Sequence, residues 1–189
     1  MRNAERGSLP RTLLRRLFGW GERCFAVIGL ILTVYHTGFQ LSPVVSPSMA
    51  PTLQGTSRQD ADWLLIEKWT YRFRRPERWE VVSFHTDWGF QVAKRVVGLP
   101  GESVALTSGI LHVNGVAAER PPALEAIDYL AYGNLHGNRS VDCGDGYYVL
   151  GDDSKDSEDS RFEGPVPTHR IEGRAWLIVW PLERFGRFG

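Results

Sequence analysis

Residues 80–115 read EVVSFHTDWGFQVAKRVVGLPGESVALTSGILHVNG, and this stretch decides the fold. Its apolar residues come in short runs that alternate with polar residues or are rich in β-branched side chains, which is typical of β-strands. The predicted strands cover residues 80–85, 90–97, 103–108 and 110–115. Short turns such as Leu99-Pro100-Gly101 and the hairpin signal Asn114-Gly115 join them. Strands joined by such short turns run antiparallel, so the stretch predicts an antiparallel sheet.

The same pattern extends to both sides of this stretch. Further strands are predicted at residues 63–68, 146–151 and 174–180, and no long amphipathic helix follows residue 60. We therefore expect a mainly β domain whose antiparallel sheets pack on one core. Residues 116–145 are irregular and polar, and we expect them to form a surface excursion.

The composition fits a folded domain and excludes several classes of protein. Hydrophobic residues make up 42% of the chain, which is too many for a disordered chain. The net charge of +0 argues against a nucleic-acid partner. Cys24 and Cys143 are the two cysteines, so a disulfide-stapled mini-protein and a four-cysteine zinc site are excluded. The His, Cys, Asp and Glu residues form no cluster with the spacing of metal ligands, so we expect no metal. We expect no cofactor either.

The N-terminal segment combines a basic start with an apolar run. Residues 1–23 hold six Arg and two Glu, and no charged side chain occurs from Cys24 to Ser57. We expect residues 24–41 to form a single transmembrane signal anchor. The positive-inside rule then places residues 1–23 in the cytoplasm and residues 42–189 outside the cell's inner membrane. A cleaved signal peptide and a buried core helix are two other interpretations of the run.

Two serines lie in a turn bracketed by prolines, SPSMAPT at residues 46–52. Proline restricts the backbone, which helps to hold a hydroxyl and the neighbouring backbone N–H groups in place. Taken alone, the turn is also compatible with an ordinary structural role.

Lys94 lies in an otherwise apolar predicted strand, next to Arg95. Side chains alternate along a strand, so one of the two cations faces inward or into a cleft. A buried lysine loses its proton more readily, and a neutral amine is a competent general base for a serine hydroxyl. The alternative is that both cations extend to water at a sheet edge.

A polar loop, GDDSKDSEDSR at residues 151–161, follows the apolar strand predicted at residues 146–151. Such a loop can hold hydroxyls and carboxylates against a site while the sheet supports it. A solvated loop is one alternative. A calcium loop is another, but Ser157 stands where such a loop has its central glycine.

Taken together, the three segments resemble those of bacterial type I signal peptidase, a membrane-anchored peptidase with a Ser/Lys dyad. The serine box, the Lys-Arg-x-x-Gly-Leu-Pro-Gly-acid box and the box at residues 151–161 occur in the family's order, and the resemblance covers residues 24 to about 181. It implies a signal-peptidase-like β domain after one transmembrane helix. It also implies a serine endopeptidase that removes N-terminal signal peptides from exported preproteins.

The resemblance assigns a role to each catalytic position. Ser48 corresponds to the nucleophile and Lys94 to the general base. The hydroxyl of Ser46 and the backbone N–H of Ser48 correspond to the oxyanion hole. Ser157 corresponds to the serine that orients the lysine amine.

Further residues correspond to supporting positions of the family. Two acid–base pairs are implied, Asp159 with Arg161 and Asp152 with Arg95. Val44 and Ala93 fall where the family lines its small substrate pockets, which favour Ala-x-Ala before the cut. The implied partners are exported preproteins and the lipid bilayer.

The chain departs from the family pattern in several places. Pro47 stands where the family usually has Gly, and Asp153 stands where the family usually has Asn. Val92 occupies a position that is often aromatic in the family. The short middle region implies that the family's extra domain is missing. Two rival functions are open: a dedicated Ser/Lys peptidase for conjugative-transfer or pilin substrates, and a non-catalytic membrane-anchored binding module.

Overall fold

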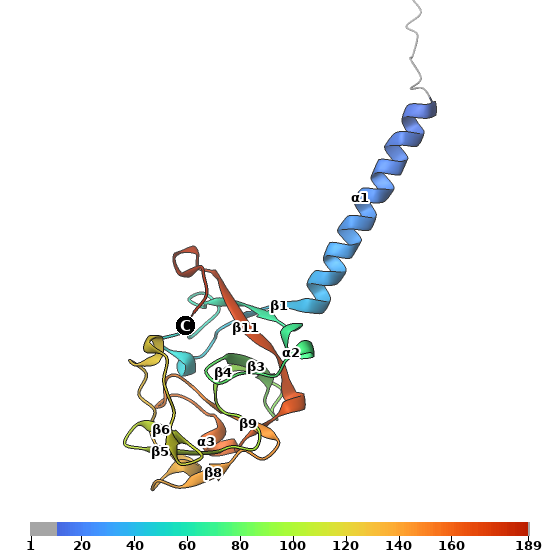
Figure 1. Cartoon of the computed structure of the whole chain (residues 1–189). Helices are drawn as coiled ribbons and strands as arrows, with labels where there is room; N and C mark the ends of the chain where they lie inside the picture. Colours follow the sequence, from blue (N-terminus) through green and yellow to red (C-terminus); the bar gives the residue numbers. More distant parts are fainter. Residues whose placement is uncertain (1–10, 189) are drawn as a thin grey trace, which may run out of the picture. The chain divides into compact units, whose positions relative to one another are not determined.

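The computed structural model describes residues 11–188, which divide into a helix and a separate β domain (Figure 1). Helix α1 covers Arg11–Gly38, and the β domain begins at Phe39. The first ten residues of the predicted cytoplasmic segment 1–23 lie outside the described residues. In the part of the chain that the structure describes, no helix has the length and apolar character needed to cross a membrane.

The helix predicted for residues 24–41 ends early, at Gly38. Residues Phe39–Pro43 instead form strand β1, which pairs antiparallel with strand β2 (Trp63–Glu67). Strand β1 pairs with β2 across five residue pairs. If residues 39–43 were helical, the backbone N–H and C=O groups along that edge of β2 would lose their partners. The boundary between the two units therefore lies after residue 38 and not after residue 41.

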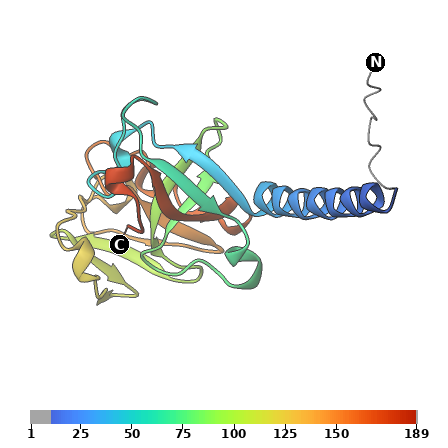
Figure 2. The same cartoon turned by 90° about the horizontal axis from the view of Figure 1, so that it is seen from above.

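The larger sheet of the described residues has seven strands in the order β1-β2-β11-β3-β4-β9-β10, and every neighbouring pair is antiparallel. Its other strands are β3 (Val81–His85), β4 (Gln91–Gly98), β9 (Gly146–Leu150), β10 (Val166–Pro167) and β11 (Ile171–Trp180). The second view shows the long strand β11, in red, lying beside β2, in green (Figure 2). The predicted mainly β, antiparallel fold is confirmed.

A second sheet within the described residues has four strands in the order β7-β6-β5-β8. They are β5 (Ser103–Thr107), β6 (Ile110–Val113), β7 (Val116–Ala117) and β8 (Ser140–Asp142). Single helical turns complete the domain: α2 (Thr70–Phe73), α3 (Ser160–Glu163) and the 3₁₀ turns Pro122–Leu124, Gly133–Leu135, Thr168–Arg170 and Leu182–Arg184.

The prediction that residues 116–145 form only a surface excursion is wrong. Leu124, Ile127, Tyr129 and Leu135 of this region are buried in a hydrophobic cluster with side chains of the second sheet. They pack there because that sheet otherwise leaves one apolar face in water. The core is also divided into three clusters among the described residues, where one was expected.

All seven predicted strands are present, and no strand end is shifted by more than three residues. Strand β4 carries Lys94 and lies between β3 and β9 in the larger sheet. Its residues 94–98 are buried. A side chain on this part of β4 is held by strands on both sides.

Candidate active site

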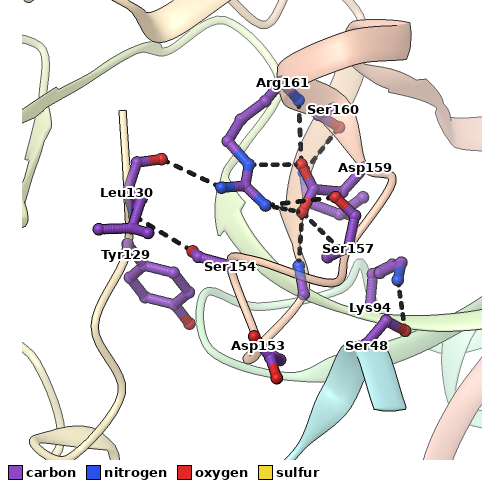
Figure 3. Close-up of polar contacts among 12 residues, drawn as sticks. Ser48, Lys94, Tyr129, Leu130, Asp153, Ser154, Ser157, Asp159, Ser160 and Arg161 are labelled. Atoms are coloured by element: carbon purple, nitrogen blue, oxygen red, sulfur yellow. Dashed lines mark hydrogen bonds and ion pairs between the residues drawn. The ribbon is translucent and has the colours of Figure 1, made fainter. Parts of the chain in front are cut away.

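Ser48 and Lys94 lie in contact although they are far apart in the sequence. Ser48 belongs to a 3₁₀ turn, Pro47–Met49, and Lys94 to strand β4. Lys94 Nζ is 2.7 Å from Ser48 Oγ (Figure 3). The side chains are also shielded from solvent, since Ser48 is 7% exposed and Lys94 is 3% exposed. The arrangement places an amine against a hydroxyl in a site that excludes most water.

Burial lowers the pKa of Lys94 from 10.5 to about 8. Removal of the ammonium group from water is the main cause, because a charge is poorly stabilised in the interior. The charge of Asp159 opposes the shift and that of Arg161 adds to it. Within residues 11–188, Lys94 forms no salt bridge that would hold it in the charged form. Its neutral form is therefore accessible close to neutral pH.

The loop after β9 packs directly on the Ser48 turn. Asp153 N–H donates to the Ser48 carbonyl oxygen at 3.1 Å. A Cβ atom at Gly151 would overlap Ser157 and come within 2.5 Å of the same Ser48 carbonyl oxygen. Gly151 thus allows the close approach of loop and turn, and sequence reasoning had not assigned it to the site.

Two serines flank the dyad in different ways. Ser46 Oγ lies 3.0 Å from Ser48 Oγ, beside the predicted nucleophile. Ser157 Oγ donates to Asp159 Oδ2 at 2.7 Å, and among the hydrogen bonds of the described residues the expected contact with the Lys94 amine is absent. The lone pairs of the Ser157 hydroxyl are left to accept a further hydrogen bond.

The predicted pair of Asp159 and Arg161 forms a buried, two-pronged ion pair. Arg161 Nε and Nη2 each donate to Asp159 at 2.8 Å, as Figure 3 shows. Asp159 also accepts the backbone N–H of Gly151 at 2.9 Å and the hydroxyl of Ser157. Arg161 reaches across to the carbonyl oxygen of Leu130 at 3.0 Å. The pair therefore holds the loop that covers Lys94.

The predicted pair of Arg95 and Asp152 lies on the other side of the loop. Arg95 Nε and Nη2 donate to the two oxygens of Asp152 at 2.8 and 2.6 Å, and both side chains are buried. Asp152 also accepts the hydroxyl of Thr52, four residues after Ser48. This pair ties strand β4 to the loop and to the serine turn.

A cavity of about 460 Å³ opens beside Ser48 and Lys94. The two predicted pocket residues, Val44 and Ala93, line it. Residues to which the sequence assigned no role in a substrate pocket line it as well: Met49, Leu64, Ile66, Ser83, Trp88, Phe90, Asp156, Glu158 and Glu163. A larger cavity of about 670 Å³, next to Cys143 and His169, contains none of the predicted site residues.

Carboxylates lie along one side of the cavity beside the dyad, and burial raises the pKa of Glu163. Within residues 11–188, no group of three or more His, Cys, Asp or Glu side chains is arranged to hold a metal ion. The chemistry of the cavity wall beside the dyad is therefore that of a hydroxyl, an amine and nearby carboxylates.

Comparisons with known proteins cover most of the chain. The family model described as "Signal peptidase, peptidase S26" matches residues 17–180. A probable signal peptidase I-2 from Synechocystis sp. is 37% identical over 155 residues, which are 76% of this chain and 64% of that relative. A signal peptidase I from Leptolyngbya laminosa is 36% identical over 155 residues, 77% of this chain and 71% of the relative. A crystal structure of a signal peptidase I from Enterococcus faecalis is 31% identical, covers 53% of this chain and 97% of that chain, and has a TM-score of 0.44.

Proposed function

Because the chain belongs to the signal peptidase family, peptidase S26, we propose that it is a serine endopeptidase that removes N-terminal signal peptides from exported preproteins. One observation carries the proposal: the amine of Lys94 lies 2.7 Å from the hydroxyl of Ser48 in a buried position beside a cavity. This is the distance at which a general base takes a proton from a nucleophile.

In the proposed reaction, neutral Lys94 accepts the proton of the Ser48 hydroxyl while Oγ attacks the scissile carbonyl carbon. The resulting ammonium of Lys94 then donates this proton to the leaving amine, and an acyl-enzyme remains on Ser48. Water attacks the acyl group in the second step, with Lys94 again accepting a proton. The ammonium of Lys94 then returns this proton to Ser48 Oγ as the bond from Oγ to the acyl carbon breaks, which releases the signal peptide and restores the neutral amine and the free hydroxyl.

Ser46 and Ser157 support this reaction in the proposal. The hydroxyl of Ser46 and the backbone N–H of Ser48 donate to the oxyanion, and one such donor contributes about 3–4 kcal/mol to transition-state stabilisation. The position of Ser46 at 3.0 Å from the nucleophile supports its role. Ser157 donates to Asp159 in the structure. In the proposed reaction its free lone pairs accept a hydrogen bond from the Lys94 amine and orient it, a contact that forms when substrate binds.

The substrate is proposed to be the extended segment before the cleavage site of a preprotein. Main-chain hydrogen bonds to an exposed strand edge provide affinity, and side-chain pockets provide specificity. The cavity lined by Val44 and Ala93 suits small side chains, in agreement with an Ala-x-Ala type of site.

Membrane attachment is part of the proposal. Residues 24–38 insert into the lipid bilayer of the inner membrane as a single-pass anchor, with residues 1–23 in the cytoplasm and the β domain from Phe39 onward outside. The apolar residues Phe25, Ile28 and Leu30 are exposed along α1, which supports a lipid contact for this segment. Cell fractionation tests this part, and recovery of the full chain in the soluble fraction would contradict it.

Cleavage of a model preprotein tests the proposed function. The purified full chain should release the mature protein, and Ser48→Ala should remove this activity because the nucleophile is gone. Ser140→Ala is the matched control, since Ser140 is an exposed serine on the second sheet and its loss should leave cleavage unchanged. Failure of the wild type to cut while it still binds the preprotein would favour the non-catalytic binding module. Cleavage of conjugative-transfer or pilin substrates alone would favour a dedicated peptidase.

The pH dependence of cleavage should follow the ionisation of Lys94. Since the reaction needs the neutral amine and the pKa of Lys94 is lowered to about 8, kcat/KM should rise about tenfold per pH unit below that pKa and level off above it. A rate profile with a peptide substrate measures this. A rise that continues up to the ordinary lysine pKa of about 10.5 would contradict the sheltered amine.

The same shift has a consequence for stability. The unfolded chain holds its Lys94 proton up to about pH 10.5, whereas the folded chain releases it near pH 8. Because the unfolded state binds more protons between these two values, the free energy of unfolding gains a contribution from Lys94 as the pH rises through this window. Below pH 8 the full cost of burying the amine applies.

A further inference from the structure

Ser83 is a buried hydroxyl that the proposed reaction does not use. It lies in strand β3, is 1% exposed, and lines the same cavity as Ser48 and Lys94. Its Oγ has no hydrogen-bond partner among the residues that the structure describes. Buried polar groups usually have a partner in the protein, in water or in a ligand, so an unpartnered hydroxyl at a cavity is available to pair with a group of a bound ligand.

The sheet places Ser83 among the residues predicted to contact the substrate. Ser83 of β3 is directly opposite Ala93 of β4, so the two side chains emerge on the same face of the sheet. Ala93 is a predicted pocket residue and immediately precedes Lys94. Ser83 therefore lies beside the predicted pocket residue Ala93, on the neighbouring strand of the sheet.

The surroundings of Ser83 are largely apolar, with Met49, Leu64 and Ile66 lining the same cavity. The other buried side-chain atoms without a partner in the described residues, Trp69 Nε1 and Tyr147 OH, belong to residues that do not line it. The hydroxyl of Ser83 is the unpaired group among these apolar neighbours, so this part of the cavity wall accepts a small apolar side chain but pairs better with a small side chain that carries a hydrogen-bonding group.

We propose that Ser83 is a specificity-determining residue that favours substrates with serine over an apolar side chain of the same size at one of the two small positions before the cut. This inference rests on the proposed function. Alternate side chains of an extended substrate point to the same face, so the first and third residues before the cut are the candidates. Ser83 has a single side-chain torsion that carries its hydroxyl, which can turn to the substrate hydroxyl without movement of β3.

Matched peptides test this proposal. A parent peptide has Ala at the first and third positions before the cut, and each position is then changed to Ser or to 2-aminobutyrate, which has a methyl group where serine has its hydroxyl. With wild-type protein, Ser should be cleaved with a kcat/KM about 3- to 10-fold above 2-aminobutyrate at one of the two positions, the ratio that one net hydrogen bond provides. In Ser83→Ala this ratio should fall to about one.

The controls separate this proposal from its premise. Ser140→Ala should keep the wild-type ratio, and Ser83→Cys provides a near-isosteric second variant if Ser83→Ala does not fold. Failure of the wild type to cleave the Ala parent rejects the proposed function. Cleavage with the same Ser ratio in wild type and Ser83→Ala, or an equal loss for every peptide, rejects the role of Ser83 alone.

Discussion

Lys94→Met should lower kcat/KM for a preprotein by about 10²- to 10⁴-fold, the size of a general-base contribution. The methionine side chain is unbranched and nearly as long as that of lysine but has no group that can accept the Ser48 proton. The fold should remain, because the variant buries an apolar side chain where the protein now buries an amine, with a pKa lowered to about 8. Below pH 8 the free energy of unfolding should rise, by up to about 3 kcal/mol.

The matched control for this variant is Lys155→Met. Lys155 is exposed in the loop that covers the site, so the variant removes the same charge without changing the dyad. It should retain wild-type cleavage. Peptide kinetics and chemical denaturation of both variants provide the comparison, and retention of more than about a tenth of the activity by Lys94→Met would end the general-base assignment.

Asp159→Ala should lower the free energy of unfolding by about 3–5 kcal/mol, because it leaves the fully buried guanidinium of Arg161 without its anion. The variant also removes the acceptor for the Gly151 N–H and for the Ser157 hydroxyl. The loop over Lys94 should therefore loosen, and kcat should fall as well. Urea denaturation followed by circular dichroism measures the first effect.

An exposed ion pair supplies the control for Asp159→Ala. Asp87 contacts Arg170 at 2.6 Å, but the two side chains are 69% and 39% exposed. Asp87→Ala should cost at most about 1 kcal/mol, because water and salt screen such pairs. In addition, the double variant Asp159→Ala/Arg161→Met should recover part of the loss, since it removes the unpaired charge. Equal small effects of Asp87→Ala and Asp159→Ala would show that the buried pair does not hold the loop.

The dyad was predicted from the resemblance of three short motifs to those of the signal peptidase family, because each motif taken alone is also compatible with an ordinary structural role. The motifs themselves indicate only the local backbone around the two residues. Ser48 lies in a proline-bracketed turn and Lys94 in an apolar strand, and each pattern indicates its backbone conformation from neighbouring residues alone. Five of the seven strands of the larger sheet were predicted in the same local way, since alternation is visible over a few residues, whereas β1 and β10 were not predicted.

Other features depend on contacts between distant segments and were missed. The apolar run from Cys24 continues smoothly into Phe39 in composition, so only the pairing with β2 shows where the helix ends. Leu124, Ile127 and Tyr129 follow neither a helical nor a strand period, and they are buried because they cover the second sheet. Burial that comes from tertiary packing leaves no regular pattern in the chain.

The site shows the same division between local and distant information. The pairing of Ser157 with Asp159 depends on how the loop folds back on Gly151, which residue spacing does not reveal. Ser83 looks like an ordinary strand residue in the sequence, and its missing partner is visible only when the cavity and its neighbours are known.

The pKa of the Lys94 amine, followed by nuclear magnetic resonance of labelled lysine side chains, tests most directly whether a proton acceptor faces the Ser48 hydroxyl. The chain has three lysines, and comparison with Lys94→Met assigns the signal of interest. The account predicts a titration midpoint of about 8 for Lys94. A midpoint near 10.5, the value of a lysine in water, would contradict it.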